Sequence, residues 1–259
     1  MSKNILNIGA VIISIIGAFF IIAPIIHIFV KLSSKSLIAT LKDGVVWHSI
    51  FTSIYCAFWA TVLGCFLGIP IGYVLSRFQF RGKSVVESII NIPVAIPHVA
   101  VGIALISLFN ERTFIGHLFK TINISFVDTV YGIVLAMMFV SISFIISSSI
   151  VGFNSVDKEV EMVARSLGAS HTYTFFRITF PLAIPSVIRG SVLAFARSIS
   201  EVGALLILAY FPKTAPILMY ERFEEYGLNA ARPVCALVIF LCLIIFFTLL
   251  YLNKKYVRS

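Results

Sequence analysis

The sequence carries little charge, and this shortage indicates the class of protein before any motif does. Only 12% of its 259 residues are Asp, Glu, Lys or Arg, whereas 59% are hydrophobic and the mean hydropathy is +1.04. Soluble domains carry about 25% charged residues. Apolar runs of about 20 residues are long enough to cross a bilayer as helices, so the composition predicts an all-α integral membrane protein.

Sites for metals, disulfides and nucleotides are missing as well. The five histidines are scattered and no Cys-x-x-Cys spacing occurs, so neither a zinc site nor a disulfide framework is expected. There is no Walker A loop, no Gly-x-Ser-x-Gly and no His-Glu-x-x-His. An intramembrane enzyme needs a nucleophile with its base, or a metal cluster. We therefore expect no catalytic site, metal or cofactor in this chain. The four cysteines all lie in apolar runs: Cys56, Cys65, Cys235 and Cys242.

Six apolar stretches predict six transmembrane helices. The first is too long for the hydrophobic region of a signal peptide and no small-x-small cleavage site follows it, so we expect it to be retained. The stretch from Phe211 to Ala231, between the last two helices, is expected to be a long loop on the outer side. The six spans lie near residues 5–30, 48–76, 88–109, 130–152, 184–211 and 233–252.

The distribution of basic residues predicts the orientation. Eleven of the twenty lysines and arginines fall on the side of the N-terminus and eight on the other side, with Arg197 left inside a span. Because cytoplasmic loops carry the excess of Lys and Arg, we expect both termini in the cytoplasm of a multi-pass plasma-membrane protein. The net charge of +9 then reflects membrane topology. No basic stripe with interleaved aromatics indicates nucleic acid.

The longest mainly polar interruption runs from Glu161 to Pro181 and is predicted to form two short helices outside the membrane. Val160, Val163, Ala164 and Leu167 recur at helical spacing on one face, opposite a possible i,i+4 pair of Glu161 and Arg165. Ser155 or Asp157 can cap the first helix, and Gly168 can end it. Ser170 can cap the second helix, and Pro181 is expected to stop it.

This interruption resembles the cytoplasmic coupling motif of ABC importer permeases, which reads EAA, three residues, Gly, nine residues, Ile, one residue, Leu-Pro. In this chain nine residues separate Gly168 from Ile178, and Phe180 precedes Pro181 where the family has Leu. Met162, Val163 and Ala164 occupy the EAA positions, with Glu161 one residue early. The alternative is an amphipathic helix lying on the membrane surface. The resemblance assigns ATPase coupling to Glu161, Val163, Ala164, Leu167, Gly168, Ala169, Ser170 and Pro181.

Two other predicted spans contain glycines or prolines spaced four residues apart. Gly64, Gly68 and Gly72 form a doubled Gly-xxx-Gly, which favours close helix packing, within the bundle or across a dimer. Pro93 and Pro97 stand four apart and disfavour a straight helix. The run around these prolines is either a proline-rich start of a helix or a broken segment near a pore. Permeases of the molybdate/tungstate/sulfate importer group carry a similar run.

The fifth span contains two ionisable residues deep in an apolar run. Arg197 and Glu201 are four apart, so they can pair on one helical face, with Ser200 close to that face and Ser198 turned away from Glu201. The pair is either a structural ion pair or a polar surface beside a translocation path. The run Phe195–Ala204 is similar to the corresponding helix of oxyanion importer permeases. The stretch 209–223 looks most like archaeal-type tungstate/molybdate permeases.

The resemblance covers about Val46 to Leu252 and implies the type I ABC importer permease fold with a cytoplasmic coupling helix. It divides the chain into an N-terminal helix and first outer loop (1–45), a permease core (46–252) and a cytoplasmic tail (253–259). It implies a homodimer in membrane lipid with two ATP-binding cassette subunits and an external tungstate- or molybdate-binding protein. Alternatives are a sulfate permease of the same kind, or an ion-coupled secondary transporter that uses Glu201, although no internal repeat supports the latter.

Overall fold

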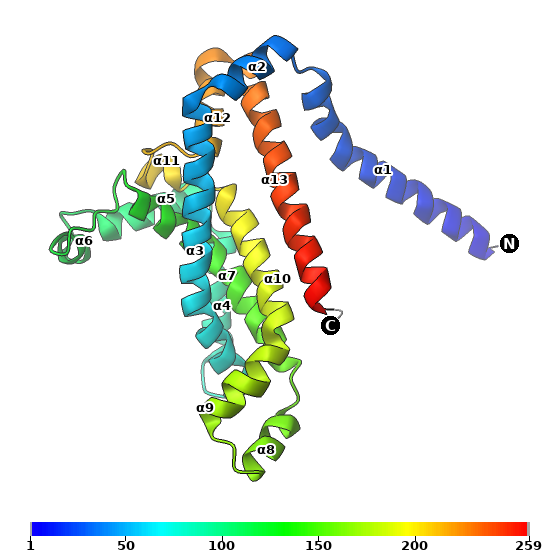
Figure 1. Cartoon of the computed structure of the whole chain (residues 1–259), viewed down its shortest axis with the longest axis vertical. Coiled ribbons are helices and arrows are strands. Elements are labelled where there is room, and N and C mark those ends of the chain that lie inside the picture. The colour runs from blue at the N-terminus through cyan, green and yellow to red at the C-terminus, as the bar shows by residue number, and fades with distance from the viewer. Residues whose placement is uncertain (1, 258–259) are drawn as a thin grey trace.

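The computed structural model describes residues 2–257, and the regular structure in that range is entirely helical. Figure 1 shows an elongated bundle with α2 and α12 at one end and α8 and α9 at the opposite end. The helices are α1 Ser2–Val30, α2 Ser34–Lys42, α3 Gly44–Arg77, α4 Lys83–Ala95, α5 His98–Phe109, α6 Phe114–Lys120, α7 Val130–Asn154, α8 Lys158–Ser166, α9 His171–Thr174, α10 Phe180–Ile199, α11 Leu205–Leu208, α12 Ala215–Tyr226 and α13 Leu228–Val257, with a π-helical turn at Phe175–Thr179.

Three long helices, α3, α7 and α10, form the centre of the bundle (Figure 1). Polar caps mark where two of them begin. The Asp43 carboxylate accepts a hydrogen bond from Val45 N at 2.8 Å before α3, and the Thr129 hydroxyl accepts one from Gly132 N at 3.2 Å before α7. Each cap satisfies an amide that the first helical turn leaves unpaired.

The glycine stripe of α3 lies against α7 in the same chain. A Cβ atom built on Gly64 or Gly68 would stand 2.9 or 3.0 Å from Ile145, and one built on Gly72 would stand 2.4 Å from the Cβ of Ser149. These distances are too short for carbon atoms in van der Waals contact. The three glycines therefore let the backbones of α3 and α7 approach closely.

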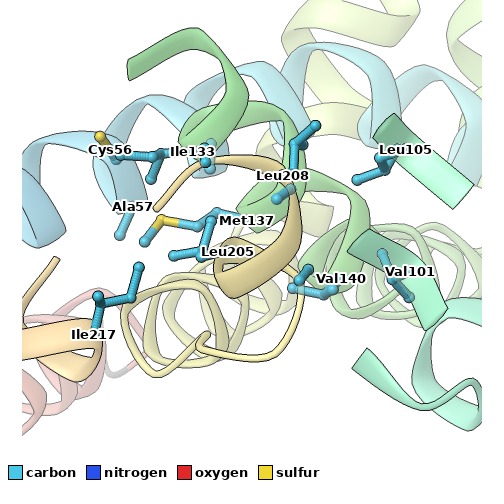
Figure 2. Close-up of a cluster of buried hydrophobic side chains, with 14 residues drawn as sticks. Cys56, Ala57, Val101, Leu105, Ile133, Met137, Val140, Leu205, Leu208 and Ile217 are labelled. Atoms are coloured by element: carbon cyan, nitrogen blue, oxygen red, sulfur yellow. The ribbon is translucent and has the colours of Figure 1, made fainter. Parts of the chain in front are cut away.

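A second contact region fixes the shorter helices to this centre. Figure 2 shows buried side chains from α3, α5, α7, α11 and α12 meeting in one apolar cluster. Met137 of α7 lies among them with Leu205 of α11 and Ile217 of α12. Because such a core is close-packed, α5 and α11 are held in fixed positions against α7. The labelled members are Cys56, Ala57, Val101, Leu105, Ile133, Met137, Val140, Leu205, Leu208 and Ile217.

Five helices are long and apolar enough to cross a membrane, and the bent pair α4–α5 makes a sixth if it counts as one span. The two members of that pair meet at an angle of 110°. Pro97 stands at the N-cap of α5, and the preceding residue, Ile96, is extended, as expected before a proline. Pro97 therefore lies at a break in the stretch 88–109, as the alternative of a broken segment predicted, whereas Pro93 lies inside α4.

Two predictions for the fifth span are wrong in the structure. Pro181 does not stop the second short helix, and the span does not cover 184–211. The helix runs from His171 to Ile199 through the π-helical turn, where Phe180 N bonds Phe175 O. The wider turn accommodates a proline that has no amide hydrogen and crowds the preceding turn. The helix then ends at Ile199, and α11 follows after a short break.

Three further predictions, for two outer loops and the C-terminal tail, differ from the structure. The outer loops expected at 31–45 and 211–231 contain α2 and α12, and α13 extends to Val257, so most of the predicted tail is helical. Residues 258 and 259 lie outside the described part of the chain. Helix α1 points away from the bundle (Figure 1), and its stretch Ala10–Val30 buries no side chain.

Candidate functional site

The break between α8 and α9 follows a standard helix-terminating motif. Gly168 adopts a φ of +92°, its N–H donates to Arg165 O at 3.0 Å, and Ala169 N donates to Ala164 O at 3.1 Å. This pair of bonds is the Schellman motif, which requires a left-handed residue that glycine adopts without strain. The Ser170 hydroxyl accepts a hydrogen bond from Tyr173 N at 3.2 Å and caps α9. The chain reverses direction at this turn, and the C-terminal end of α8 is exposed.

The apolar side chains of this segment face outward rather than into the bundle. Helix α8 buries none of its residues, and Leu167 is 84% exposed at its end. Ala164 and Ala169 are half-buried, and Pro181 is exposed at the start of α10. We name the exposed set the α8 surface, and an apolar surface of this kind marks a contact with a protein or a membrane. It consists of Val160, Met162, Val163, Leu167, Tyr173 and Phe176.

Glu161 points the other way, toward the bundle. The predicted pairing with Arg165 gives way to a pair with Arg77, the last residue of α3, at 2.5 Å. Thr179 of the π-helical turn donates to the same carboxylate oxygen at 3.0 Å. The Arg77 guanidinium is only 7% exposed, and a buried cation needs a counter-charge more than the exposed Arg165 does. Sequence spacing could not show this partner, because 84 residues separate the two.

Arg197 and Glu201 form the expected ion pair, and a third residue joins them. The Arg197 guanidinium lies 2.8 Å from the Glu201 carboxylate and 2.6 Å from Nε2 of His98. His98 Nδ1 lies 3.4 Å from the same carboxylate. Glu201 is 1% exposed and also accepts from Ala204 N at 2.8 Å, ahead of α11. We name Arg197, Glu201 and His98 the intramembrane cluster.

The intramembrane cluster sits where two helix breaks meet. His98 is the first residue of α5, after the Pro97 break, and Glu201 lies in the break between α10 and α11. A Cβ built on Gly203 would stand 2.7 Å from the Cβ of His98, and one on Gly102 would stand 2.7 Å from Ala204 O. Glycine at both positions therefore lets the two breaks interlock. His98 was not among the predicted site residues, and its only sequence signal is its place directly after Pro97.

Of the other site residues predicted here, Ser200 lies beside the intramembrane cluster, whereas Ser198 and Pro93 are buried in the packing around it. Ser200 is exposed and lies 3.4 Å from an Arg197 nitrogen. Ser198 is buried and donates to Met137 O at 3.3 Å, away from the cluster. Pro93 is buried within α4. The guanidinium charge of Arg197 is thus balanced by the Glu201 carboxylate.

A second group of ion pairs lies at the end opposite α8. Arg222 of α12 pairs with Asp43 at 2.5 Å, and Lys213 lies 2.6 Å from Glu221. The Tyr210 hydroxyl donates to Glu221 at 2.9 Å. Burial, together with the hydrogen bond to Glu221, raises the pKa of Tyr210 to about 12. Burial alone would raise the pKa of Glu221, but the hydrogen bonds from Lys213 and Tyr210 outweigh it and lower that pKa below 4.5.

We expect Glu221→Gln to reduce stability at neutral pH by up to about 1 kcal/mol, the scale of a partly exposed pair. A carboxylate whose folded pKa is lowered stabilises the fold fully above its unfolded pKa, and the contribution disappears as the pH falls through the folded value. The difference in melting temperature between the wild type and Glu221→Gln should therefore shrink below pH 4.5. The measurement is thermal unfolding in detergent from pH 7 to pH 3. The exposed Glu224→Gln serves as control, and a difference that stays constant across this range would contradict the assignment.

Among residues 2–257, no group of three or more His, Cys, Asp or Glu side chains is arranged to hold a metal ion. The fold and the two sites define a membrane-embedded permease with the type I ABC importer fold. A solved bacterial ABC transporter that imports the acidic polysaccharide alginate superposes with a TM-score of 0.75 at 15% identity, covering 98% of this chain and 96% of that one. A methionine ABC transporter superposes with a TM-score of 0.64 at 16% identity, covering 83% of this chain and 95% of that one.

The chain belongs to the family described as binding-protein-dependent transport system inner membrane component, which matches residues 64–258. It is 42% identical to the molybdate/tungstate transport system permease protein of Pyrococcus abyssi over 93% of this chain and 94% of that protein. The corresponding protein of Methanocaldococcus jannaschii is 40% identical, covering 88% of each chain. A probable sulfate transport system permease protein of Chlorokybus atmophyticus is 32% identical over 93% of this chain and 87% of that one.

Proposed function

We propose that this chain is the membrane subunit of an ATP-driven importer of tungstate or molybdate. The observation that carries the proposal is the α8 surface, which the Gly168 turn presents at one end of the bundle and whose apolar side chains are exposed in the described part of the chain. The substrate class follows from the molybdate/tungstate permeases at 40–43% identity. Sulfate is the second candidate, since a sulfate permease is 32% identical over a similar length.

In this proposal the end of the bundle formed by α8 faces the cytoplasm, in agreement with the excess of basic residues on that side. Two ATP-binding cassette subunits dock on the α8 surfaces of a homodimer, and the chain itself catalyses no reaction. A binding protein loaded with the oxyanion docks at the opposite end, near α2 and α12. Both termini are then cytoplasmic.

The intramembrane cluster supports a translocation path that passes the oxyanion without holding it tightly. A doubly charged anion needs donors and positive potential, and Arg197, Ser200 and the start of α5 offer these. Glu201 balances the charge of Arg197, which weakens the attraction for an anion. A weak site suits a conduit, because strong capture slows release. Selectivity then belongs to the binding protein.

The experiment that tests the proposal measures ATP hydrolysis in vesicles that contain this chain and its candidate ATPase. Binding protein is added empty and then loaded with tungstate, molybdate or sulfate. Stimulation by one loaded form identifies the importer and its substrate. If the ATPase does not associate with the chain at all, the docking role of the α8 surface is wrong. The protein is then better interpreted as an ion-coupled transporter.

We expect Leu167→Glu to reduce the ATPase recovered with the chain on the order of ten-fold. Leu167 is the most exposed apolar side chain of the α8 surface, and a charge buried in an apolar contact without a partner weakens binding strongly. The measurement is co-purification in detergent. Leu228→Glu is the matched control, since Leu228 is also exposed but begins α13, beside α12 at the opposite end. Equal losses in the two variants would remove the α8 surface from the contact.

A further inference from the structure

Helix α8 is held against the bundle by ionic and polar contacts rather than by packing. It buries no residue. The Glu161 carboxylate accepts from Nε of Arg77 at 3.0 Å and from a terminal nitrogen of Arg77 at 2.5 Å, and that nitrogen also donates to Val156 O at 3.1 Å. Thr179, which is 1% exposed, adds a bond at 3.0 Å. A displacement of α8 is therefore transmitted to the bundle through Arg77, at the C-terminal end of α3.

Helix α3 carries a second ion pair at its other end. It spans 34 residues, Gly44–Arg77, which is about 51 Å at 1.5 Å per residue. Asp43, its N-cap, pairs with Arg222 of α12 at 2.5 Å. Figure 1 shows α3 running from the end with α2 and α12 toward the end with α8. One helix thus has one ion pair to α8 and another to α12.

Toward its α8 end the body of α3 is packed closely against α7, including the stretch around Pro70. The close contact of its glycine stripe with α7 continues to Gly72. Next to the stripe, the ring of Tyr73 meets Phe153 at 5.2 Å and Phe175 of the π-helical turn at 4.8 Å, both edge to face. Close-packed interiors transmit displacement rather than absorb it.

We propose that α3 is a rigid link that couples the two ends of the permease, with Arg77 and Asp43 as its positioning residues. The proposal rests on the proposed function, in which the ATPase docks at α8 and the loaded binding protein docks near α12. Through the Asp43–Arg222 pair, docking near α12 shifts α3 together with α7, on which it is packed. Through the Arg77–Glu161 pair, the shift reaches α8 and the ATPase. Neither Arg77 nor Asp43 lies on the α8 surface.

A position between two sites does not by itself establish coupling, so the test measures coupling directly. The variants are Arg77→Gln and Asp43→Asn, singly and together, in vesicles with the ATPase and with binding protein added empty or loaded with tungstate, molybdate or sulfate. Asn can keep the cap on Val45 N while it removes the charge. Lys83→Gln is the matched control for Arg77, because it removes one positive charge of a partly exposed pair at the start of α4. Glu111→Gln is the control for Asp43.

We expect each single variant to bind the ATPase as the wild type does and to lose stimulation by loaded binding protein at least about five-fold, the lower range of allosteric coupling. The double variant should lose no more than the worse single one, because both changes interrupt one link. Arg77→Lys, which keeps the charge, should recover part of the stimulation. Unchanged stimulation in Asp43→Asn, or independent losses that multiply in the double variant, would overturn the proposal. Failure of the wild-type chain to bind the ATPase would instead refute the proposed function.

Discussion

Replacing Arg197 with methionine should destabilise the protein by about 3–5 kcal/mol, the usual effect of breaking a buried ion pair. Methionine fills a similar volume but leaves the Glu201 carboxylate, 1% exposed, without its cation. The other side chain within ion-pair distance of that carboxylate is His98, at 3.4 Å. The measurement is thermal unfolding of the purified chain in detergent, together with oxyanion uptake in reconstituted vesicles.

Two further variants separate charge from packing at this position. Arg197→Met with Glu201→Gln removes both charges, and the glutamine oxygen can still accept from Ala204 N, so most of the stability should return. If uptake stays low while stability returns, the cluster serves transport as well as folding. Arg197→Lys keeps the charge but not the planar fork, and it should lie between the wild type and Arg197→Met. A single Met variant as stable as the wild type would contradict the buried pair.

Gly72→Ala should destabilise the contact between α3 and α7 by about 1–3 kcal/mol, the range for overpacked cores. The added Cβ would stand 2.4 Å from the Cβ of Ser149 and 3.2 Å from Ile146 O and Ile150 N. Carbon atoms prefer about 3.5–4.0 Å, so the helices must separate locally by about 1 Å. The neighbouring atoms are backbone or directly attached to it, so they cannot rotate away. Melting temperature in detergent measures the loss.

The control for this change is Gly17→Ala in α1, where nothing lies within 4 Å of the new Cβ. It should leave stability unchanged or raise it slightly, because alanine favours helix over glycine. Adding Ser149→Gly to Gly72→Ala removes the nearest colliding atom and should restore part of the loss. If Gly72→Ala melts like the wild type, the close approach of the two helices is not present in the membrane protein.

The features that the sequence predicted well depend on short spacing. The i,i+4 distance between Arg197 and Glu201 was sufficient for their ion pair, and the left-handed turn at Gly168 follows from a glycine after an amphipathic stretch. The apolar runs were sufficient to predict that the spans exist, because length and composition decide whether a helix can cross a bilayer, but they did not show where the fifth span begins and ends. Pro93 and Pro97 indicated a break, although not its angle of 110°.

The features that the sequence did not predict depend on contacts between distant segments. Glu161 has a basic residue four positions away, yet it pairs with Arg77, because a buried guanidinium has the greater need of a counter-charge. His98 joins the intramembrane cluster only because α5 and α11 pack in one core. The end of the fifth span at Ile199 follows from that same packing. Pro181 did not stop its helix, because widening one turn was sufficient to admit it.

The π-helical turn at Phe175–Thr179 also determines a direction. Such a turn holds about one residue more than an α-helical turn, and one residue corresponds to about 100° of rotation around a helix axis. The residues that join α9 to α10 therefore set the angle at which the α8 surface emerges around the axis of α10, and Thr179 faces Glu161 only at that angle. The direction in which α8 points is therefore set by the number of residues in this turn, of which only Phe176 belongs to the α8 surface.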